Sequence, residues 1–373
     1  MMTERVFNFS PGPAALPLPV IEQIRQDMVA LPGTGCSILE LSHRGSAFLQ
    51  ILAQAKADLI QLMQIPDNYR IVFLQGGSRM QFSMVPMNLL RGASQPADYL
   101  VTGSWGSKAM QEAKREGEVR AVWNGASSNF DRLPAPSEWA VNPQSPYLHF
   151  TSNETIQGVQ FGNEPEVGRV PLVCDASSDF LSRPIPFEKY GLIYACAQKN
   201  AGPAGVTIVV IRQDLLERSS DHLPGYLNYY NHVQEDSLYN TPPTFGVYVV
   251  GLVVRWLLDE IGGLRKMDQI NQQKANHLYE VLDNSEGFYQ GHAQAPCRSK
   301  MNVTFRLPSA ELQQQFLQQA QERKLHNLRG HRSVGGIRAS IYNALSLEGV
   351  ILLRDFMQEF CDTHRSFVGL TNS

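Results

Sequence analysis

Short apolar runs and helical patterns alternate through the first part of the chain. The runs that predict buried strands lie at 71–74, 147–150, 192–195 and 206–211. Helical periodicity accompanies the early runs, at 48–63, 81–90 and 107–116. Strands that alternate with helices are typical of an α/β sandwich around a mostly parallel sheet. Because such sheets bind ligands beyond the carboxyl ends of their strands, polar residues that follow the runs are candidate site residues.

The pattern changes near residue 245. An apolar helix is expected over 245–261, where Gly262 and Gly263 form a typical C-terminal cap, and a polar helix over 267–282. Farther on, the pattern predicts one strand and two helices, at 302–305, 309–324 and from Ser346 onward. We therefore expect a smaller C-terminal α+β domain after the large α/β domain.

Length and composition agree with two domains. A chain of 373 residues can bury two cores, and 43% hydrophobic with 18% charged residues is ordinary for a globular protein. We predict that the large domain covers 16–262 and that the small domain covers 1–15 together with 263–373.

Charge and cysteine content exclude several classes of partner. The net charge is −3 without a long basic run, which argues against nucleic acid. The five cysteines lack the CxxC spacing of zinc sites, so we expect no metal and free thiols in a reducing cytoplasm. The N-terminal residues contain no apolar core of signal-peptide length, and the longest apolar stretch, 245–258, is too short for a bilayer and contains Arg255. A cytoplasmic protein without a membrane partner is expected.

A single lysine follows the strand-like run at 192–195. Lys199 opens a loop of small residues with Gly and Pro. A lysine in apolar surroundings has a lowered pKa and can act as a nucleophilic amine, as in a Schiff base with pyridoxal 5'-phosphate. The alternative is a lysine that has simply reached the surface at a strand end.

A single acidic residue ends a second apolar run that predicts a strand. Asp175 follows 171–174, and an aspartate that faces the pyridine nitrogen of pyridoxal phosphate keeps that nitrogen protonated. Asp175 could instead be a helix cap or a turn residue. An aspartate and Lys199 at the ends of neighbouring strands would face one ligand, and this pairing favours the cofactor site.

Two small-residue turns could complete such a site. The turn at 76–79 (Gly-Gly-Ser-Arg) lies between a strand and a helix, where free backbone N–H groups bind phosphate, although it lacks the Walker pattern. Trp105 in a glycine-rich turn is suited to stack on a pyridine ring, or is a partly buried structural residue. Thr155 could hydrogen-bond the cofactor, but alone it resembles any turn residue.

Three basic segments lie beside glycines. They contain the pair His43–Arg44, the pair His331–Arg332, and Arg338. Arginine binds carboxylate or phosphate through two parallel hydrogen bonds. These segments predict a substrate with more than one anionic group. The alternative interpretation is that they are scattered surface arginines.

With these residues in place, the chain resembles the phosphoserine aminotransferase family, of the fold-type I, class V aminotransferases, almost from end to end. The most specific motifs lie at 42–44 (Ser-His-Arg), 197–200 (Ala-Gln-Lys-Asn), 239–244 and 330–343. The resemblance implies a large α/β domain with a mostly parallel sheet and a smaller C-terminal α+β domain. Many members have a third glycine where this chain has Ser78, which would carry strain if that position needs a positive φ.

The resemblance implies a role for each candidate in the cofactor site. Lys199 is expected to form the Schiff base with pyridoxal 5'-phosphate and to move a proton between substrate and cofactor. Asp175 is expected to pair with the pyridine nitrogen, and Trp105 to stack on the ring. The remaining cofactor contacts are expected from Ser78, Arg79, Thr155 and Gln198.

The resemblance also implies a homodimer with shared active sites. Asn240 and Thr241 are expected to reach the cofactor phosphate of the other subunit, and Arg338 to hold the substrate α-carboxylate. His43 and Arg44 are expected to bind the distal phosphate or carboxylate together with His331 and Arg332 from the other subunit. Ser10 is expected to lie near the glutamate site.

The implied reaction is reversible amino transfer between L-glutamate and 3-phosphohydroxypyruvate, which gives O-phospho-L-serine and 2-oxoglutarate in serine biosynthesis. Formation of 4-phosphohydroxy-L-threonine in vitamin B6 (pyridoxine) synthesis is expected as a second activity. Two alternatives stay open. One is a class V transaminase for alanine, serine or glyoxylate, or a cysteine desulfurase. The other is a non-enzymatic scaffold of the same fold, which has no need of Lys199 and Asp175.

Overall fold

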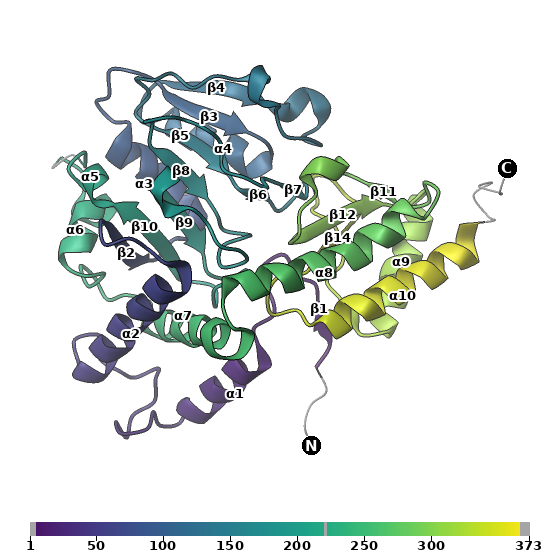
Figure 1. The fold of residues 1–373 in the computed structure, drawn as a ribbon. Helices are drawn as coiled ribbons and strands as arrows, with labels where there is room; N and C mark the ends of the chain where they lie inside the picture. The colour runs from purple at the N-terminus through teal and green to yellow at the C-terminus, as the bar shows by residue number, and fades with distance from the viewer. Residues whose placement is uncertain (1–4, 220–221, 366–373) are drawn as a thin grey trace.

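The computed structural model describes residues 5–219 and 222–365, and it has two bodies side by side (Figure 1). The larger body contains a seven-stranded sheet in the order β2-β10-β9-β8-β5-β3-β4. The strands are β2 (Tyr69–Leu74), β3 (Ala97–Val101), β4 (Val119–Asn124), β5 (Leu148–Thr151), β8 (Leu172–Asp175), β9 (Tyr190–Cys196) and β10 (Thr207–Arg212). Only β10 runs antiparallel to its neighbours within this sheet, so the predicted mostly parallel sheet is confirmed.

Helices cover both faces of this sheet. They are α1 (Leu18–Asp27), α2 (Ser46–Met63), α3 (Gly77–Leu89), α4 (Ser104–Ala113), α5 (Gln213–Leu216), α6 (Tyr229–Gln234) and α7 (Thr244–Trp256). Alternate residues of one strand belong to different cores: Ile193 packs in the core of α2 and α7, and Leu192 and Tyr194 pack in the core of α3 and α4. Burial on both faces explains why the strands read as continuous apolar runs.

The smaller body has an antiparallel sheet of β11 (Gln290–Gly291), β12 (Asn302–Arg306) and β14 (Ile337–Ser340). Its helices are α8 (Leu264–Asp283), α9 (Ala310–Glu322) and α10 (Leu347–His364). The N-terminal strand β1 (Phe7–Asn8) pairs in parallel with β13 (Leu325–His326), and Phe9 is buried in the core of this body. The domain bounds at 16, 262 and 263 stay a prediction.

Short elements complete the fold. Strands β6 (Asn153–Glu154) and β7 (Val159–Gln160) form a two-stranded sheet. Helix α7 continues into one π turn, Leu257–Ile261, which ends at Gly262 with φ 85°, a left-handed conformation that suits the predicted glycine cap. Within residues 5–219 and 222–365, no helix combines the length and the apolar character that crossing a membrane requires.

A fully buried lysine joins α8 to the segment after β14. Lys274 Nζ lies 3.0, 2.7 and 3.1 Å from the carbonyl oxygens of Ile341, Tyr342 and Leu345. Burial lowers the pKa of Lys274 to about 7. Three acceptors nevertheless match the three N–H groups of an ammonium, so the charge is held by backbone dipoles in place of water. The segment that carries Tyr342 is thereby fixed against α8.

We expect Lys274→Met to lower the free energy of unfolding by about 3 kcal/mol, because methionine keeps the apolar stem but leaves three buried carbonyls without donors. Urea unfolding followed by circular dichroism measures the change. Lys266→Met, on the exposed side of the same helix, is the matched control. Equal stability of the two variants would contradict the role assigned to Lys274.

Candidate active site

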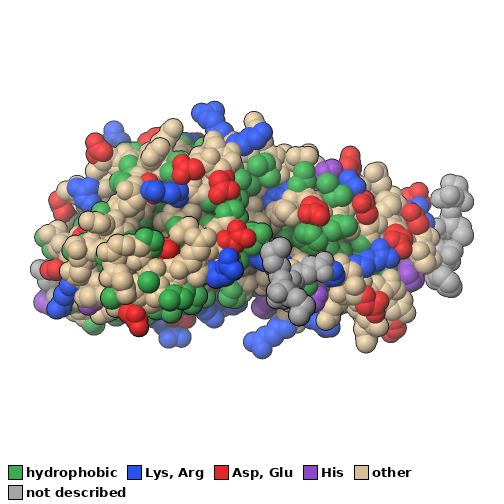
Figure 2. Space-filling view, turned by 90° about the horizontal axis from the view of Figure 1, so that it is seen from below, with side chains coloured by type: hydrophobic (Ala, Val, Ile, Leu, Met, Phe, Trp, Pro, Cys, Tyr) green, Lys and Arg blue, Asp and Glu red, His purple; other side chains and the backbone are tan. Residues whose placement is uncertain are grey.

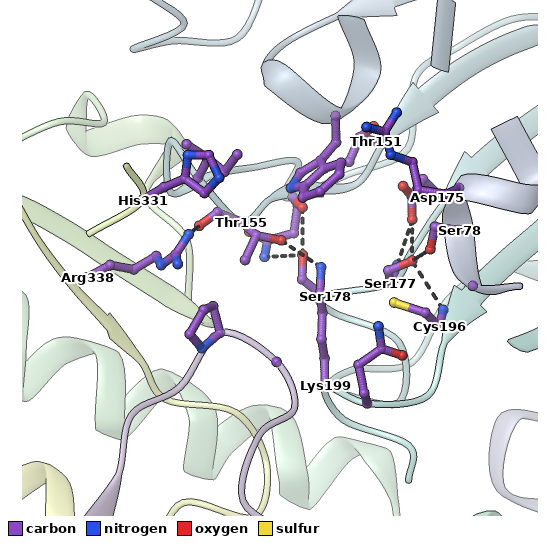
Figure 3. Close-up of a pocket in the computed structure, with 18 of the residues that line it drawn as sticks. Ser78, Thr151, Thr155, Asp175, Ser177, Ser178, Cys196, Lys199, His331 and Arg338 are labelled. Atoms are coloured by element: carbon purple, nitrogen blue, oxygen red, sulfur yellow. Dashed lines mark hydrogen bonds between the residues drawn. The ribbon is translucent and has the colours of Figure 1, made fainter. Parts of the chain in front are cut away.

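A cavity of about 400 Å³ opens where the carboxyl ends of the strands meet the smaller body. Residues that follow β2, β3, β5, β8 and β9 line it, because these five strands point in one direction across the sheet. The smaller body contributes His331 and Arg338, and the N-terminal segment contributes Pro11 and Gly12. Figure 3 shows these side chains converging on one space. Its size is that of a small-molecule or cofactor site.

Asp175 and Lys199 reach this cavity from neighbouring parallel strands. Asp175 is the last residue of β8, and Lys199 lies three residues after the end of β9. Both line the cavity, as the sequence pattern predicted. Lys199 Nζ donates a hydrogen bond to Thr155 Oγ1 at 2.8 Å, which directs the amine across the cavity (Figure 3).

The pKa of Lys199 differs from the expectation. Burial is the largest influence and lowers this pKa, but Tyr342, Cys196 and Asp175 together outweigh it, so the pKa of Lys199 is raised. The prediction of a lowered pKa was therefore wrong, because it considered only apolar neighbours. Burial likewise raises the pKa of Asp175, and Lys199 and Ser177 counteract part of that increase. The two groups thus support each other's charged forms across the cavity.

Ser177 fixes the orientation of Asp175. Asp175 Oδ1 accepts hydrogen bonds from the backbone N–H and the hydroxyl of Ser177, at 3.0 and 2.5 Å. The Ser177 hydroxyl also lies 2.5 Å from the Ser78 hydroxyl and accepts from the Cys196 N–H at 3.3 Å. Within the described part of the chain, the hydrogen bonds to the Asp175 carboxylate end on Oδ1, so Oδ2 is left for a ligand. Our sequence analysis missed Ser177, although a serine two residues after an aspartate is typical of a turn that orients it.

The turn before α3 presents the start of a helix to the cavity. Gly76 and Gly77 have φ values of 92° and 63°, which only glycine adopts readily. Ser78 lies inside α3 and has no positive φ, so serine at this position carries no strain. The free N–H groups of a helix start, together with the helix dipole, bind phosphate. Arg79 also lines the cavity here.

The carboxyl group of Glu154 binds backbone N–H groups at the start of α4. Its fully buried carboxylate accepts hydrogen bonds from the N–H groups of Trp105 and Gly106, at 3.0 and 2.8 Å. Gly103 permits this approach, because a Cβ atom there would lie 2.3 Å from the Glu154 carboxyl carbon. Burial raises the pKa of Glu154 to about 7 against the effect of the two N–H donors. This carboxyl group, which our sequence analysis missed, fixes the backbone of Trp105 at the start of α4.

Several polar atoms around the cavity are buried without a partner. They are Trp105 Nε1, Thr151 Oγ1 and Arg338 Nε, within the part of the chain that the structure describes. Arg338 makes one long contact, from Nη1 to the Thr155 carbonyl at 3.4 Å. Buried polar groups are normally hydrogen-bonded, so these atoms indicate a polar ligand.

Amide side chains join the cavity floor to the smaller body. Asn153 donates to Asn302 at 2.8 Å, and the Asn343 N–H donates to Asn200, the residue after Lys199, at 3.0 Å. Asn271 on α8 donates to Asn343 at 2.8 Å. All five asparagines are buried, so the Lys199 loop and the body that carries Arg338 are held in one arrangement.

The structure brings together most of the predicted site residues but not all. Those that line the cavity are Ser78, Arg79, Trp105, Thr155, Asp175, Gln198, Lys199, His331 and Arg338. Those that do not line it are Ser10, His43, Arg44, Asn240, Thr241 and Arg332. His331 lines the cavity of its own chain, whereas the resemblance implied that the other subunit supplies it. Ser10 and Arg332 adjoin lining residues, and Asn240 donates to Gln75, which precedes the Gly76–Gly77 turn, at 3.0 Å. Lining residues that were not predicted include Thr151, Asn153, Ser177, Ser178 and Cys196.

Residues 6–353 match the family model "Aminotransferase class-V". The chain therefore belongs to the class V aminotransferases. It is 55% identical over 358 residues to the phosphoserine aminotransferase of Rhodopirellula baltica, covering 96% of this chain and 95% of that protein.

Two solved structures have the same fold over nearly the whole chain. The phosphoserine aminotransferase from Bacillus circulans subsp. alkalophilus superposes with a TM-score of 0.94 at 46% identity, over 97% of this chain and 100% of that one. The enzyme from Trichomonas vaginalis, with bound pyridoxal phosphate, gives a TM-score of 0.91 at 39% identity, over 95% and 100%. Within class V, the chain is a member of the phosphoserine aminotransferase family.

Glu154 makes stability depend on pH. Its folded-state pKa of about 7 lies above the ordinary 4.5, so between these values the native state holds a proton that the unfolded state has lost. We expect the free energy of unfolding of the wild type, relative to Glu154→Gln, to fall by roughly 3 kcal/mol as pH rises from 5 to 8. Urea unfolding at the two pH values measures this. Exposed Glu118→Gln is the control, and a pH-independent difference for Glu154→Gln would contradict the assignment.

Proposed function

We propose that this protein catalyses reversible transfer of an amino group between L-glutamate and 3-phosphohydroxypyruvate, giving O-phospho-L-serine and 2-oxoglutarate. The observation that carries the proposal is one cavity in which Lys199 and Asp175 lie beside unneutralised basic side chains. Membership of the phosphoserine aminotransferase family supports the same reaction.

The basic side chains separate this reaction from transamination of smaller substrates. Among the residues that the structure describes, Arg79, Arg332 and Arg338 form no ion pair with a carboxylate, although most other arginines do. Arg338 is buried, and a buried cation without a counter-ion is costly unless a ligand supplies the negative charge. A substrate with an α-carboxylate and a distal phosphate or carboxylate supplies it at both ends.

The cavity residues fit pyridoxal 5'-phosphate. The orphaned Trp105 Nε1 and Thr151 Oγ1, the unused Asp175 Oδ2 and the helix start at Gly77 match a flat ring with a phosphate. Ser78, Arg79, Thr155 and Gln198 are the further residues that would hold the cofactor. When bound, pyridoxal phosphate supplies a ring that withdraws electrons from the reacting carbon of the amino acid.

Each side chain then has a defined task. Asp175 would stabilise a proton on the ring nitrogen, and Trp105 would pack against the ring. Lys199 would hold the cofactor through its amine, and its Nζ would accept the proton that leaves the substrate Cα. Arg338 binds the α-carboxylate through its guanidinium, which orients the Cα–H bond.

One anion-binding pocket can serve both halves of the reaction. The phosphate of the phosphorylated substrate and the γ-carboxylate of glutamate are both distal anions, which His43, Arg44, His331 and Arg332 would bind, with Ser10 near the glutamate site. The related four-carbon phosphate of vitamin B6 synthesis carries the same distal group, so formation of 4-phosphohydroxy-L-threonine is proposed as a second activity.

A homodimer with shared active sites is part of the proposal. His43 and Arg44 lie in the turn before α2, and Asn240 and Thr241 lie before α7. All four residues are outside the cavity of their own chain. Large apolar side chains are exposed nearby on and around α1 and α2, at Leu18, Met28, Val29, Leu39 and Leu49. Figure 2 views the side on which α1 lies, where hydrophobic side chains are exposed and acidic and basic ones are interspersed. Large apolar side chains that stay exposed around two helices favour a protein interface. The five free cysteines favour a reducing cytoplasm.

Visible absorbance of the purified protein tests the function. We expect O-phospho-L-serine to change the spectrum of the bound cofactor at concentrations at which L-serine has no effect. An equal response to L-serine would favour a class V transaminase without a need for the phosphate. No cofactor absorbance, even after pyridoxal phosphate is added, would refute the proposal.

We expect Lys199→Ala to abolish amino transfer, because no other amine reaches the same position, while the thermal unfolding midpoint stays within a few degrees of the wild type. Turnover is followed by coupled assay of 2-oxoglutarate. Exposed Lys114→Ala should retain full activity. Near-normal turnover of Lys199→Ala would refute the Schiff-base role.

Shared sites predict complementation between inactive variants. When Lys199→Ala and Arg44→Ala chains are mixed and reassociated, heterodimers contain one site with both changes and one intact site. We expect up to about a quarter of wild-type activity to return, since half of the dimers are mixed and each has one good site. The pair Lys199→Ala and Arg332→Ala is the control without recovery, because both residues serve the site of one chain. No recovery with Arg44→Ala would contradict the shared site.

A further inference from the structure

Lys108 lies on α4 three residues after Trp105, so the two side chains share one face of the helix. Its Nζ is 4.3 Å from the centre of the Trp105 ring, the ring that lines the cavity. The residue is partly buried and lies in the middle of α4, where the helix dipole neither favours nor disfavours a cation strongly.

The charged groups around Lys108 come from three elements. Burial is the largest influence that lowers the pKa of Lys108, and repulsion from Arg79 on α3 is the next. Arg332 lowers this pKa further, whereas Glu154 raises it. The pKa of His331 is lowered in turn by burial, Arg338, Lys108 and Arg332. Basic side chains from α3, α4 and the smaller body therefore converge on one edge of the cavity.

Negative charge at this edge is almost absent within the described chain. Lys108 and Arg332 form no ion pair there, and the one nearby carboxylate, Glu154, is engaged with the N–H groups of Trp105 and Gly106. Like charges that converge without a counter-ion raise the free energy of the folded chain. The cation–π contact with Trp105 offsets only about 0.5–1 kcal/mol at such a site.

We propose that Lys108 is a specificity-determining residue that binds the distal anionic group of the substrate, together with His331 and Arg332. This inference rests on the proposed function, and it adds a residue that neither the motifs nor the cavity lining pointed to. The ammonium supplies a compact charge beside the flat guanidinium of Arg332, a combination suited to the three oxygens of a phosphate.

Steady-state kinetics of the holoenzyme test the proposal. We compare wild type, Lys108→Met, Lys108→Arg and, as control, exposed Lys114→Met at the C-cap of the same helix. Lys108→Met should raise KM for O-phospho-L-serine and the inhibition constant of inorganic phosphate about tenfold, with little change in kcat, as loss of one charge-assisted hydrogen bond predicts. Lys108→Arg should restore both to within about threefold, because it keeps the charge.

A second measurement separates binding from ring positioning. If Lys108 only supported Trp105, Lys108→Met would weaken retention of pyridoxal phosphate and leave phosphate inhibition unchanged, which would overturn the proposal. Unchanged KM and inhibition constants would overturn it as well. If the wild type did not act on O-phospho-L-serine, the proposed function would fail. Titration of wild type and Lys108→Met with inorganic phosphate, followed by tryptophan fluorescence, would still decide whether Lys108 binds the anion.

Discussion

Burial of the large sheet on both faces is the constraint on which the rest of the structure depends. Because helices cover each face, the strands have no free surface, and their carboxyl ends are the places where polar side chains can meet a ligand. Asp175, Lys199, Trp105 and the Gly76–Gly77 turn share one cavity for this reason, although they are far apart in sequence.

The site then depends on charges that are kept away from water. Asp175 and Glu154 are buried and Lys199 is half-buried. Asp175 is held by Ser177 and Lys199, Glu154 by two N–H groups of a helix start, and Lys199 by neighbouring polar groups. A low-dielectric setting makes each of these interactions stronger than at the surface. The basic edge around Arg332 has no such internal partner, which leaves the neutralising charge to the substrate.

The sequence was sufficient for a mostly parallel sheet with strands β2, β5, β8, β9 and β10, for most helices and for the pair Asp175–Lys199, because apolar runs mark buried strands and single polar residues mark their ends. It was not sufficient for strands β3 and β4. It was not sufficient for Ser177, Glu154 and Lys108, whose importance comes from neighbours on other elements. The raised pKa of Lys199 was missed for the same reason, since its causes, above all Tyr342, come from distant segments. The contribution of His43, Arg44, Asn240 and Thr241 depends on a second chain.

The asparagines between the two bodies have a chemical consequence. Amides neither gain nor lose protons over the range in which carboxylates, imidazoles and amines titrate. Asn153, Asn200, Asn271, Asn302 and Asn343 therefore keep their hydrogen bonds at any pH at which the chain is folded. Acidity can change the charge on the catalytic groups while the distance between the Lys199 loop and the Arg338 strand stays the same, so titration alters reactivity and leaves alignment intact.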